Sequence, residues 1–188
     1  MRLSVASKWS YSLTVQEEAV AARVGWERQL PFLGQPERNR NYSEGDIWEA
    51  WQHMIAAASE IAAARIMGFP DFEPHANTFK TVLDIPGYEV RYSFTKPYDD
   101  GPKYALRFRK GVDDPDQIYI LIVGGPEVKT RRTPDNGYAA PPFNAIGWMK
   151  GEDMLKEDYV SLYGKNNFSV PAGHLNEMST LPVIERVH

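Results

Sequence analysis

The spacing of apolar residues changes near residue 79, and this change limits the folds open to the chain. Before it, apolar side chains recur at helical intervals, as at Trp51, Ile55 and Ala62. After it they alternate with polar residues, as over 88–94, which is the pattern of a strand. A chain with its helices first and its strands afterwards predicts an α+β or three-layer α/β domain, with helices packed on a mixed or mainly antiparallel sheet.

Two helices are predicted in the first part of the chain. A capping box at Thr14 and Glu17 begins a helix that runs toward residue 29. Ser43 or Asp46 is expected to cap a second helix, which ends at Gly68. The segment between them is rich in Pro, Gly, Asn and Arg, and it is expected to form a loop.

The second part of the chain predicts a sheet. Strands are expected over residues 79–85, 88–94, 104–110, 117–123 and 143–149. The run 117–123 is apolar throughout, which is typical of a central strand covered on both faces. A long Gly/Pro-rich loop is expected over 124–142, a final helix over 152–163 and an irregular tail from 164. Residues 1–188 are thus predicted to form one domain, with helices over 14–68, a sheet core over 79–149, and a helix and tail over 152–188.

Composition excludes several classes of protein. The chain has 188 residues and no cysteine, which excludes a disulfide framework, a thiol nucleophile and a cysteine-ligated zinc site. The net charge of −4 argues against broad nonspecific binding of nucleic acid and leaves a local basic surface open. No apolar run is long enough to cross a bilayer, and the first residues lack the apolar core of a signal peptide. We therefore expect a cytoplasmic protein without a membrane partner.

Two carboxylates are predicted to oppose each other across a tight turn. Pro86-Gly87 is a strong two-residue turn signal, and folding the chain there pairs Asp84 with Glu89. Like charges directly opposite in a hairpin are destabilising. Two interpretations stay open. A divalent cation could bind between the two acids, or Arg91, on the same strand face as Glu89, could neutralise them in a salt-bridge cluster.

Glu60 is the third candidate acid. Its helical neighbours at i±3 and i±4 are Ala56, Ala57, Ala63 and Ala64, so no basic residue of its own helix can pair with it. These small neighbours let another element approach closely. Glu60 is either a carboxylate pointed at the sheet or an exposed residue on an alanine-rich helix.

Other polar residues have a structural interpretation. Asp113, Asp114 and Asp116 precede the apolar run and predict a turn rather than a metal cluster. Arg107 and Arg109 share one strand face, where they either line a phosphate path or solvate an open surface. The four histidines, His53, His75, His174 and His188, have no metal-ligand spacing.

Taken in order, Glu60 on a helix, Asp84 on a strand and Glu89-Val90-Arg91 on the next strand form a known pattern. They resemble the PD-(D/E)XK, or restriction-endonuclease-like, nuclease superfamily, in which a helical acid is followed by a strand Asp and by Glu-x-Lys. Asp113-Asp114-Pro115-Asp116 and Ile146-Gly147-Trp148-Met149 add a likeness to a branch found in phage and bacterial genomes. The resemblance covers about residues 15–155.

The resemblance implies a three-layer fold, with a central mixed sheet of about five strands flanked by helices. It implies Mg²⁺ or Mn²⁺ held by Asp84, Glu89 and the Val90 carbonyl, with Glu60 contributing directly or through water. Hard oxygen ligands suit these ions. This chain departs from the family at Arg91, which stands in place of the lysine. Arginine is a poor proton shuttle but forms a bidentate phosphate clamp.

The resulting functional expectation is metal-dependent hydrolysis of DNA phosphodiester bonds, with Glu60, Asp84, Glu89 and Arg91 as catalytic residues. The alternative is a catalytically inactive nuclease-fold module that binds nucleic acid or protein as a regulator. Basic side chains expected to contact the substrate are Arg107, Arg109, Lys129, Arg131 and Arg132. DNA is the expected partner, a protein partner or a homodimer is a further possibility, and a phage-encoded chain is expected in the host cytoplasm.

Overall fold

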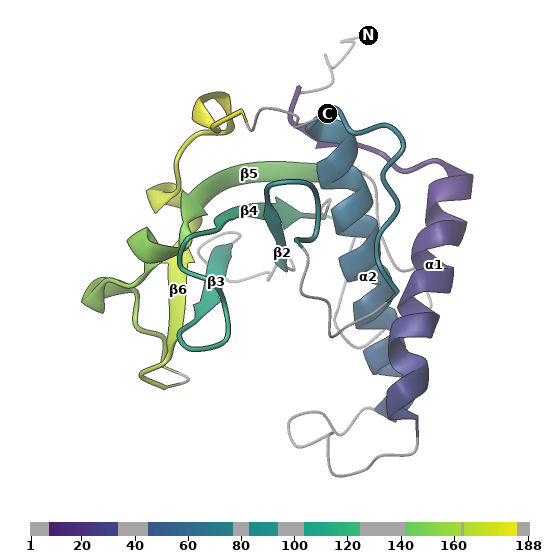
Figure 1. The fold of residues 1–188 in the computed structure, drawn as a ribbon, viewed down its shortest axis with the longest axis horizontal. Helices are drawn as coiled ribbons and strands as arrows, with labels where there is room; N and C mark the ends of the chain where they lie inside the picture. The colour runs from purple at the N-terminus through teal and green to yellow at the C-terminus, as the bar shows by residue number, and fades with distance from the viewer. Residues whose placement is uncertain are drawn as a thin grey trace, which may run out of the picture.

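A computed structural model describes residues 8–33, 45–76, 83–93, 104–124, 142–162 and 164–183, with side chains from residue 49 onward in the second range. The fold is α+β, with a four-stranded mixed sheet, a separate two-stranded sheet and two long helices (Figure 1). The helices are α1 (Val15–Gln29) and α2 (Gly45–Ile66). The strands are β1 (Ser10–Tyr11), β2 (Glu89–Ser93), β3 (Ala105–Arg109), β4 (Ile118–Val123), β5 (Phe143–Lys150) and β6 (Asn167–Pro171).

Helix α1 begins at the predicted capping box. The Thr14 backbone N–H donates to the Glu17 carboxylate over 2.9 Å, and the Glu17 backbone N–H donates to the Thr14 hydroxyl over 3.3 Å. These reciprocal bonds satisfy two backbone donors that the first helical turn leaves over. The Arg65 guanidinium of α2 also lies 2.7 Å from the Glu17 carboxylate, so the start of α1 is tied to the end of α2.

Helix α2 carries the predicted apolar stripe. Trp51, Ile55 and Ala62 are all buried. The helix begins at Gly45, so Asp46 lies within it and is not its cap, and residue 43 lies outside the described residues. The helix ends at Ile66, two residues before Gly68, whose φ of +82° reverses the chain direction. The two helices pack closely because Gly25 of α1 has no side chain. A Cβ added there would lie 2.5 Å from the backbone nitrogen of Met54.

The central sheet has the order β1-β5-β4-β2. Strand β4 pairs parallel to β2 and antiparallel to β5, so it is central, as its apolar sequence predicts. Ile120 and Ile122 pack in the core shared with the helices. Tyr119 and Leu121 pack in a second core with β3 and β6. Because successive side chains of β4 point to opposite faces of the sheet, the strand contributes residues to both cores.

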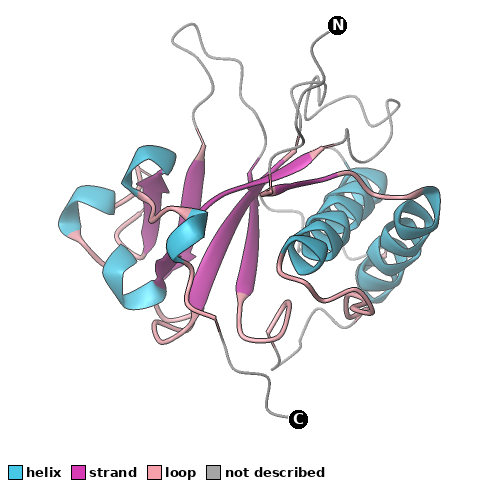
Figure 2. Cartoon of the chain, turned by 90° about the horizontal axis from the view of Figure 1, so that it is seen from above, coloured by secondary structure: helices cyan, strands magenta, loops and turns pink. Residues whose placement is uncertain are grey.

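Different structures cover the two faces of the central sheet. Figure 2 shows α1 and α2 on one side and the small β3–β6 sheet with several short helices on the other. The predicted helix over 152–163 is wrong, because this segment forms two 3-10 turns, Gly151–Met154 and Glu157–Tyr159. Its first backbone donors are taken by the turn before β4: the N–H of Gly151 donates to Gln117 and the N–H of Glu152 to Pro115.

The tail from residue 164 is not irregular as expected, because it contains β6. This strand pairs antiparallel with β3, so β3 leaves the central sheet and forms a second one. Phe108 of β3 lies opposite Phe168 of β6, and both are buried. Pairing two half-apolar strands buries both apolar faces against β4 and β5.

The turn at Pro86-Gly87 forms as predicted. Ile85 and Tyr88 exchange backbone hydrogen bonds of 3.1 and 3.0 Å, and Gly87 has a φ of +87°. The following residues form β2, which pairs with β4. Of the strand expected over 79–85, residues 79–82 lie outside the described residues, and 83–85 contribute a single bridge.

Two further expectations are limited by what the structure describes. Most of the loop expected over 124–142 lies outside the described residues, and Lys129, Arg131 and Arg132 lie with it. Within the described ranges, no helix has the length and apolar character needed to cross a bilayer.

Candidate functional site: an arginine among three carboxylates

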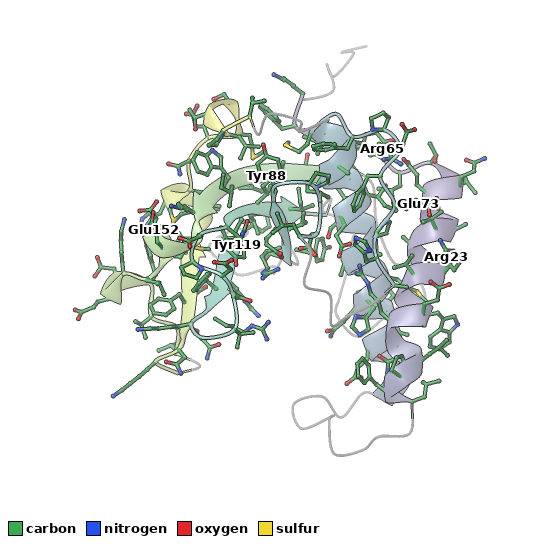
Figure 3. The ribbon with its side chains drawn as sticks, in the orientation of Figure 1. Arg23, Arg65, Glu73, Tyr88, Tyr119 and Glu152 are labelled. Carbon is green, nitrogen blue, oxygen red and sulfur yellow. The ribbon has the colours of Figure 1, made fainter. Side chains whose placement is uncertain are left out.

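The predicted residues Asp84, Glu89 and Arg91 do come together, at the edge of the central sheet. The parallel register places Glu89 beside Tyr119 and Arg91 beside Leu121. Both β2 side chains therefore project from the sheet face that carries the β3–β6 core, away from the two long helices. Tyr119 is labelled in Figure 3 and marks this part of the molecule.

One nitrogen of Arg91 lies where three oxygens meet. Nη1 is 3.2 Å from a carboxylate oxygen of Glu89 and donates to the Val90 carbonyl oxygen over 3.3 Å. The same nitrogen is 3.7 Å from Oδ2 of Asp84, which is ion-pair distance. These oxygens belong to the three groups that the family resemblance implies as metal ligands. The guanidinium nitrogen therefore lies among the oxygens of these three groups.

The other guanidinium nitrogen of Arg91 reaches a carboxylate that we interpreted only as part of a turn. Nη2 is 3.1 Å from Oδ1 of Asp113. Asp113 also forms the turn after β3, because the Arg109 backbone N–H donates to its second oxygen over 2.7 Å. The Arg109 guanidinium lies 3.5 Å from the same carboxylate. We call Asp84, Glu89, Arg91 and Asp113 the Arg91 cluster.

Contacts with the backbone and with an aromatic ring support the Arg91 cluster. The Val90 backbone N–H donates to Oδ2 of Asp84 over 2.8 Å, which fixes that carboxylate. The Arg91 guanidinium lies over the Tyr119 ring, 5.0 Å from its centroid, within the range of a cation–π contact. The Tyr119 hydroxyl in turn donates to the Asp114 carbonyl over 3.0 Å. Backbone and ring contacts thus hold the side chains in one arrangement.

The side chains of the Arg91 cluster are largely buried, and this affects the pKa of Arg91. The side chains of Asp84, Glu89 and Asp113 are 8%, 18% and 6% exposed, and that of Arg91 is 28% exposed. Burial by itself lowers the pKa of the Arg91 guanidinium, but Asp113, Asp84 and Glu89 outweigh it and raise the pKa above its usual value. Arg91 is therefore a permanent cation at any physiological pH.

The donors of the cluster suit a hard metal ion by their chemistry, since they are carboxylate and carbonyl oxygens. Their arrangement does not fit one, because Nη1 of Arg91 takes the central position and an ion cannot share it with a fixed cation. Within the described ranges, no three Asp, Glu or His side chains are placed to hold a metal ion together. The binding of Mg²⁺ or Mn²⁺ by this chain stays a prediction.

Glu60 lies in a different environment from the Arg91 cluster. Its side chain is 6% exposed, and its two oxygens accept from Nη1 and Nη2 of Arg28 over 2.9 and 2.8 Å. Arg28 belongs to α1, so the partner comes from another helix, as the alanine neighbours of Glu60 allow. The third donor of Arg28, Nε, donates to the His75 carbonyl over 2.7 Å. Glu60 is therefore buried, and a guanidinium of the other long helix binds its carboxylate.

The two arginines of β3 lie on an open face. Leu106 and Phe108 are buried, whereas Arg107 and Arg109 are exposed. The register with β6 places Ser169 beside Arg107 and Asn167 beside Arg109. The outer face of the β3–β6 sheet therefore carries two guanidinium groups and two neutral polar side chains, directly beside Asp113.

The chain has no significant match to a protein-family model, to a curated protein or to a solved structure. The likeness to restriction-endonuclease-like proteins therefore stays a prediction from the sequence motifs.

Proposed function

We propose that this chain is a binding module for the phosphate backbone of DNA that works without metal-dependent cleavage. The observation that carries the proposal is the position of Arg91 Nη1 among the oxygens of Asp84, Glu89 and Val90. A fixed guanidinium there supplies positive charge at the place where nucleases of this type keep an ion. It cannot generate hydroxide from water, because arginine does not act as a Lewis acid and does not lose its proton.

The outer face of the β3–β6 sheet is the surface proposed to contact DNA. Residues two apart on a strand face are about 6.6–6.8 Å apart. Two long side chains at that spacing, Arg107 and Arg109, can contact neighbouring phosphates of one DNA strand. Guanidinium groups suit this role because they form paired hydrogen bonds with phosphate oxygens. Ser169 and Asn167 beside them add neutral hydrogen-bonding groups.

Arg109 links this surface to the Arg91 cluster. Its backbone N–H and its guanidinium both contact Asp113, whose carboxylate also contacts Arg91. A phosphate bound by Arg109 therefore lies next to the buried acids, whose charge is balanced in part by Arg91. The net charge of −4 keeps the nonspecific attraction to DNA weak, so we expect micromolar or weaker binding at physiological salt.

The test is fluorescence anisotropy with labelled single- and double-stranded 20-nucleotide DNA, measured in EDTA. Wild-type protein is expected to bind, and Arg107→Ala is expected to weaken binding at least several-fold. Arg23→Ala is the matched control. It removes the same charge from an exposed position on α1, on the helix side of the molecule (Figure 3). Absence of saturable binding by the wild type, or an equal loss in both variants, would contradict the proposal.

Metal-dependent cleavage of DNA is the second candidate, favoured by one observation. Three carboxylates of low exposure converge within contact of a single side chain, and such acid groups are found at metal-dependent hydrolytic sites. The test is incubation with linear, circular and single-stranded DNA in Mg²⁺ and in Mn²⁺. Cleavage that disappears in Asp84→Ala would establish this candidate and overturn the metal-independent proposal.

A further inference from the structure

An exposed apolar stripe runs along the outer face of α1. Val15, Trp26 and Leu30 are 77%, 46% and 59% exposed. Ala19 and Ala22 lie between them and are exposed and partly exposed. At about 3.6 residues per turn, these five side chains fall within about 80° of the helix circumference. We call them the α1 stripe. Single exposed apolar residues are ordinary, whereas a contiguous apolar patch is typical of an interaction surface.

The opposite face of α1 already packs against α2. Ala21, Val24 and Gly25 are buried on that face, and Figures 1 and 2 show α2 between α1 and the central sheet. A helix that only covers a domain needs one apolar face and turns a polar face to water. Because α1 has two apolar faces, packing inside the domain explains only one of them.

The spacing of the α1 stripe matches the seam of a coiled coil. Its first four members are separated by four, three and four positions, which is the alternation of d and a positions in a heptad. Val15 and Ala22 then take d positions, and Ala19 and Trp26 take a positions. The alanines let a second helix approach closely, and the tryptophan offers a large apolar surface to bury. The stripe therefore fits another helix.

The charges beside the α1 stripe favour a second copy of α1 in parallel orientation. In the same heptads Glu18 takes position g and Arg23 takes position e, on opposite sides of the stripe. In a parallel two-stranded coiled coil, a g residue lies beside an e residue of the partner helix. Two copies related by a twofold axis therefore form two Glu18–Arg23 ion pairs. In an antiparallel pair g faces g and e faces e, so these opposite charges do not meet.

Arg23 can exchange its present partners at little cost. In the single chain its guanidinium lies 3.1 Å from the carboxylate of Glu27 and 3.6 Å from that of Glu73. The Arg23 side chain is 53% exposed, and exposed ion pairs of this kind contribute little to stability. A contact with Glu18 of a second copy therefore offsets the loss of either one.

We propose that two copies of this chain associate through the α1 stripe as a parallel, twofold-symmetric pair of helices. Helix α1 has 15 residues, so the seam is about 22 Å long. A seam of that length and one helix wide buries less than the roughly 800 Å² that each partner of a stable complex usually buries, so we expect a Kd weaker than about 1 μM. The inference does not depend on DNA binding, so either proposal can fail without the other.

Sedimentation velocity of the full chain tests the association, at concentrations from about 5 to about 500 μM, which bracket a weak dimer. Wild type is expected to change from monomer to dimer across this range, and Leu30→Glu is expected to raise the Kd at least tenfold. Leu162→Glu is the matched control, because it makes the same change at a fully exposed leucine just before β6. An equal effect of the two variants would overturn the proposal. A wild type that stays monomeric throughout would also overturn it and leave the stripe to a helix of another protein.

Charge reversal tests the register of the two helices. Glu18→Arg and Arg23→Glu are each expected to weaken the dimer several-fold, because each places like charges beside each other. The double variant restores opposite charges and is expected to recover most of the wild-type affinity. A double variant that is as weak as the two single effects combined would show that these side chains do not meet, and would overturn the parallel arrangement.

The absence of cysteine allows a direct test of orientation. Ala22→Cys places one thiol at a d position, where a parallel pair brings it beside the same residue of the second copy. With oxidised glutathione as oxidant, this variant is expected to form a disulfide-linked dimer on a non-reducing gel, and Leu162→Cys is expected to form far less. Equal yields from the two variants would contradict a parallel seam along α1.

Discussion

Arg28 of α1 and Glu60 of α2 form a bidentate ion pair in which both side chains are 6% exposed. The pair joins the two long helices, and the Nε of Arg28 extends it to the His75 carbonyl. Glu60, the helical acid of the sequence pattern, therefore links α2 to α1 in this chain.

Glu60→Gln is expected to destabilise the protein by about 3–5 kcal/mol, because it leaves the buried Arg28 charge without its carboxylate partner. Urea unfolding followed by circular dichroism measures the change. The double variant Arg28→Met/Glu60→Leu is the control, since an apolar pair of similar volume often restores the stability that a single change removes. A loss below about 1 kcal/mol in Glu60→Gln would show that the ion pair has little structural weight.

Acid is expected to destabilise the protein through His53. Burial, followed by the charge of Arg28, lowers the pKa of His53 to about 4 from its ordinary 6.5. Between these values the unfolded chain binds a proton that the folded protein does not, so stability is lost as pH falls from 6.5 to 4. One pKa unit corresponds to about 1.4 kcal/mol, so the loss is at most about 3.5 kcal/mol. Urea unfolding at pH 7, 5.5 and 4.5 measures it.

His53→Gln separates this contribution from the carboxylates that titrate at similar pH. The difference in unfolding free energy between wild type and His53→Gln is expected to shift against the wild type as pH falls from 6.5 to 4. A difference that stays constant across this range would show that His53 has the same pKa in the folded and unfolded chains.

Gly25→Ala is expected to destabilise the helix pair. The added Cβ would lie 2.4–2.6 Å from side-chain and backbone atoms of Met54, so the helices must move apart. Such overpacking costs about 1–3 kcal/mol, which exceeds the gain of up to about 1 kcal/mol from the better helix propensity of alanine. Gly173→Ala is the control, because no atom lies within 4 Å of its added Cβ. Equal stability of both variants by thermal unfolding would contradict the close approach of α1 and α2.

The salt dependence of DNA binding is expected to reflect the number of phosphate contacts made by the arginines of β3. Each phosphate contact contributes about 0.7 to the slope of log K against log salt concentration for single strands, and about 0.9 for duplex. Arg107→Ala should reduce the slope by about one such step, and Arg23→Ala should leave it unchanged. Anisotropy titrations at salt concentrations from about 25 to about 200 mM measure this slope. An unchanged slope in Arg107→Ala would place the phosphate contacts elsewhere.

Local parts of the fold could be predicted from the sequence because their causes are local. The capping box at Thr14 and Glu17 and the turn at Pro86-Gly87 each depend on residues within a few positions of one another. The continuous apolar run of β4 also indicates its central place. Strand partners were not predictable in the same way. The pairing of β3 with β6 joins segments about 60 residues apart, and no local pattern specifies it.

In the candidate site, too, the local contacts could be predicted from the sequence and the long-range contacts could not. The approach of Asp84 and Glu89 follows from the turn between them, and neutralisation by Arg91 was one of the two interpretations that the sequence left open. Asp113 was assigned to a turn, which it forms, but its contact with Arg91 spans 22 residues and depends on how β3 leaves the central sheet. The pair of Arg28 with Glu60 likewise required the packing of two helices. The sequence showed that no basic residue on the helix of Glu60 could pair with it. It did not show that the partner would be Arg28 on the other helix.

The position of β1 at the edge of the central sheet has a consequence for how the protein is made. Ser10 and Tyr11 pair with Asn144 and Phe143, and the Ala145 N–H donates to the Trp9 carbonyl. During synthesis the two long helices leave the ribosome long before β5 does. Their apolar faces therefore stay partly exposed until more than 70 further residues have been synthesised and the sheet that buries them is complete. Apolar surface that is exposed in this way before folding is complete is prone to aggregation.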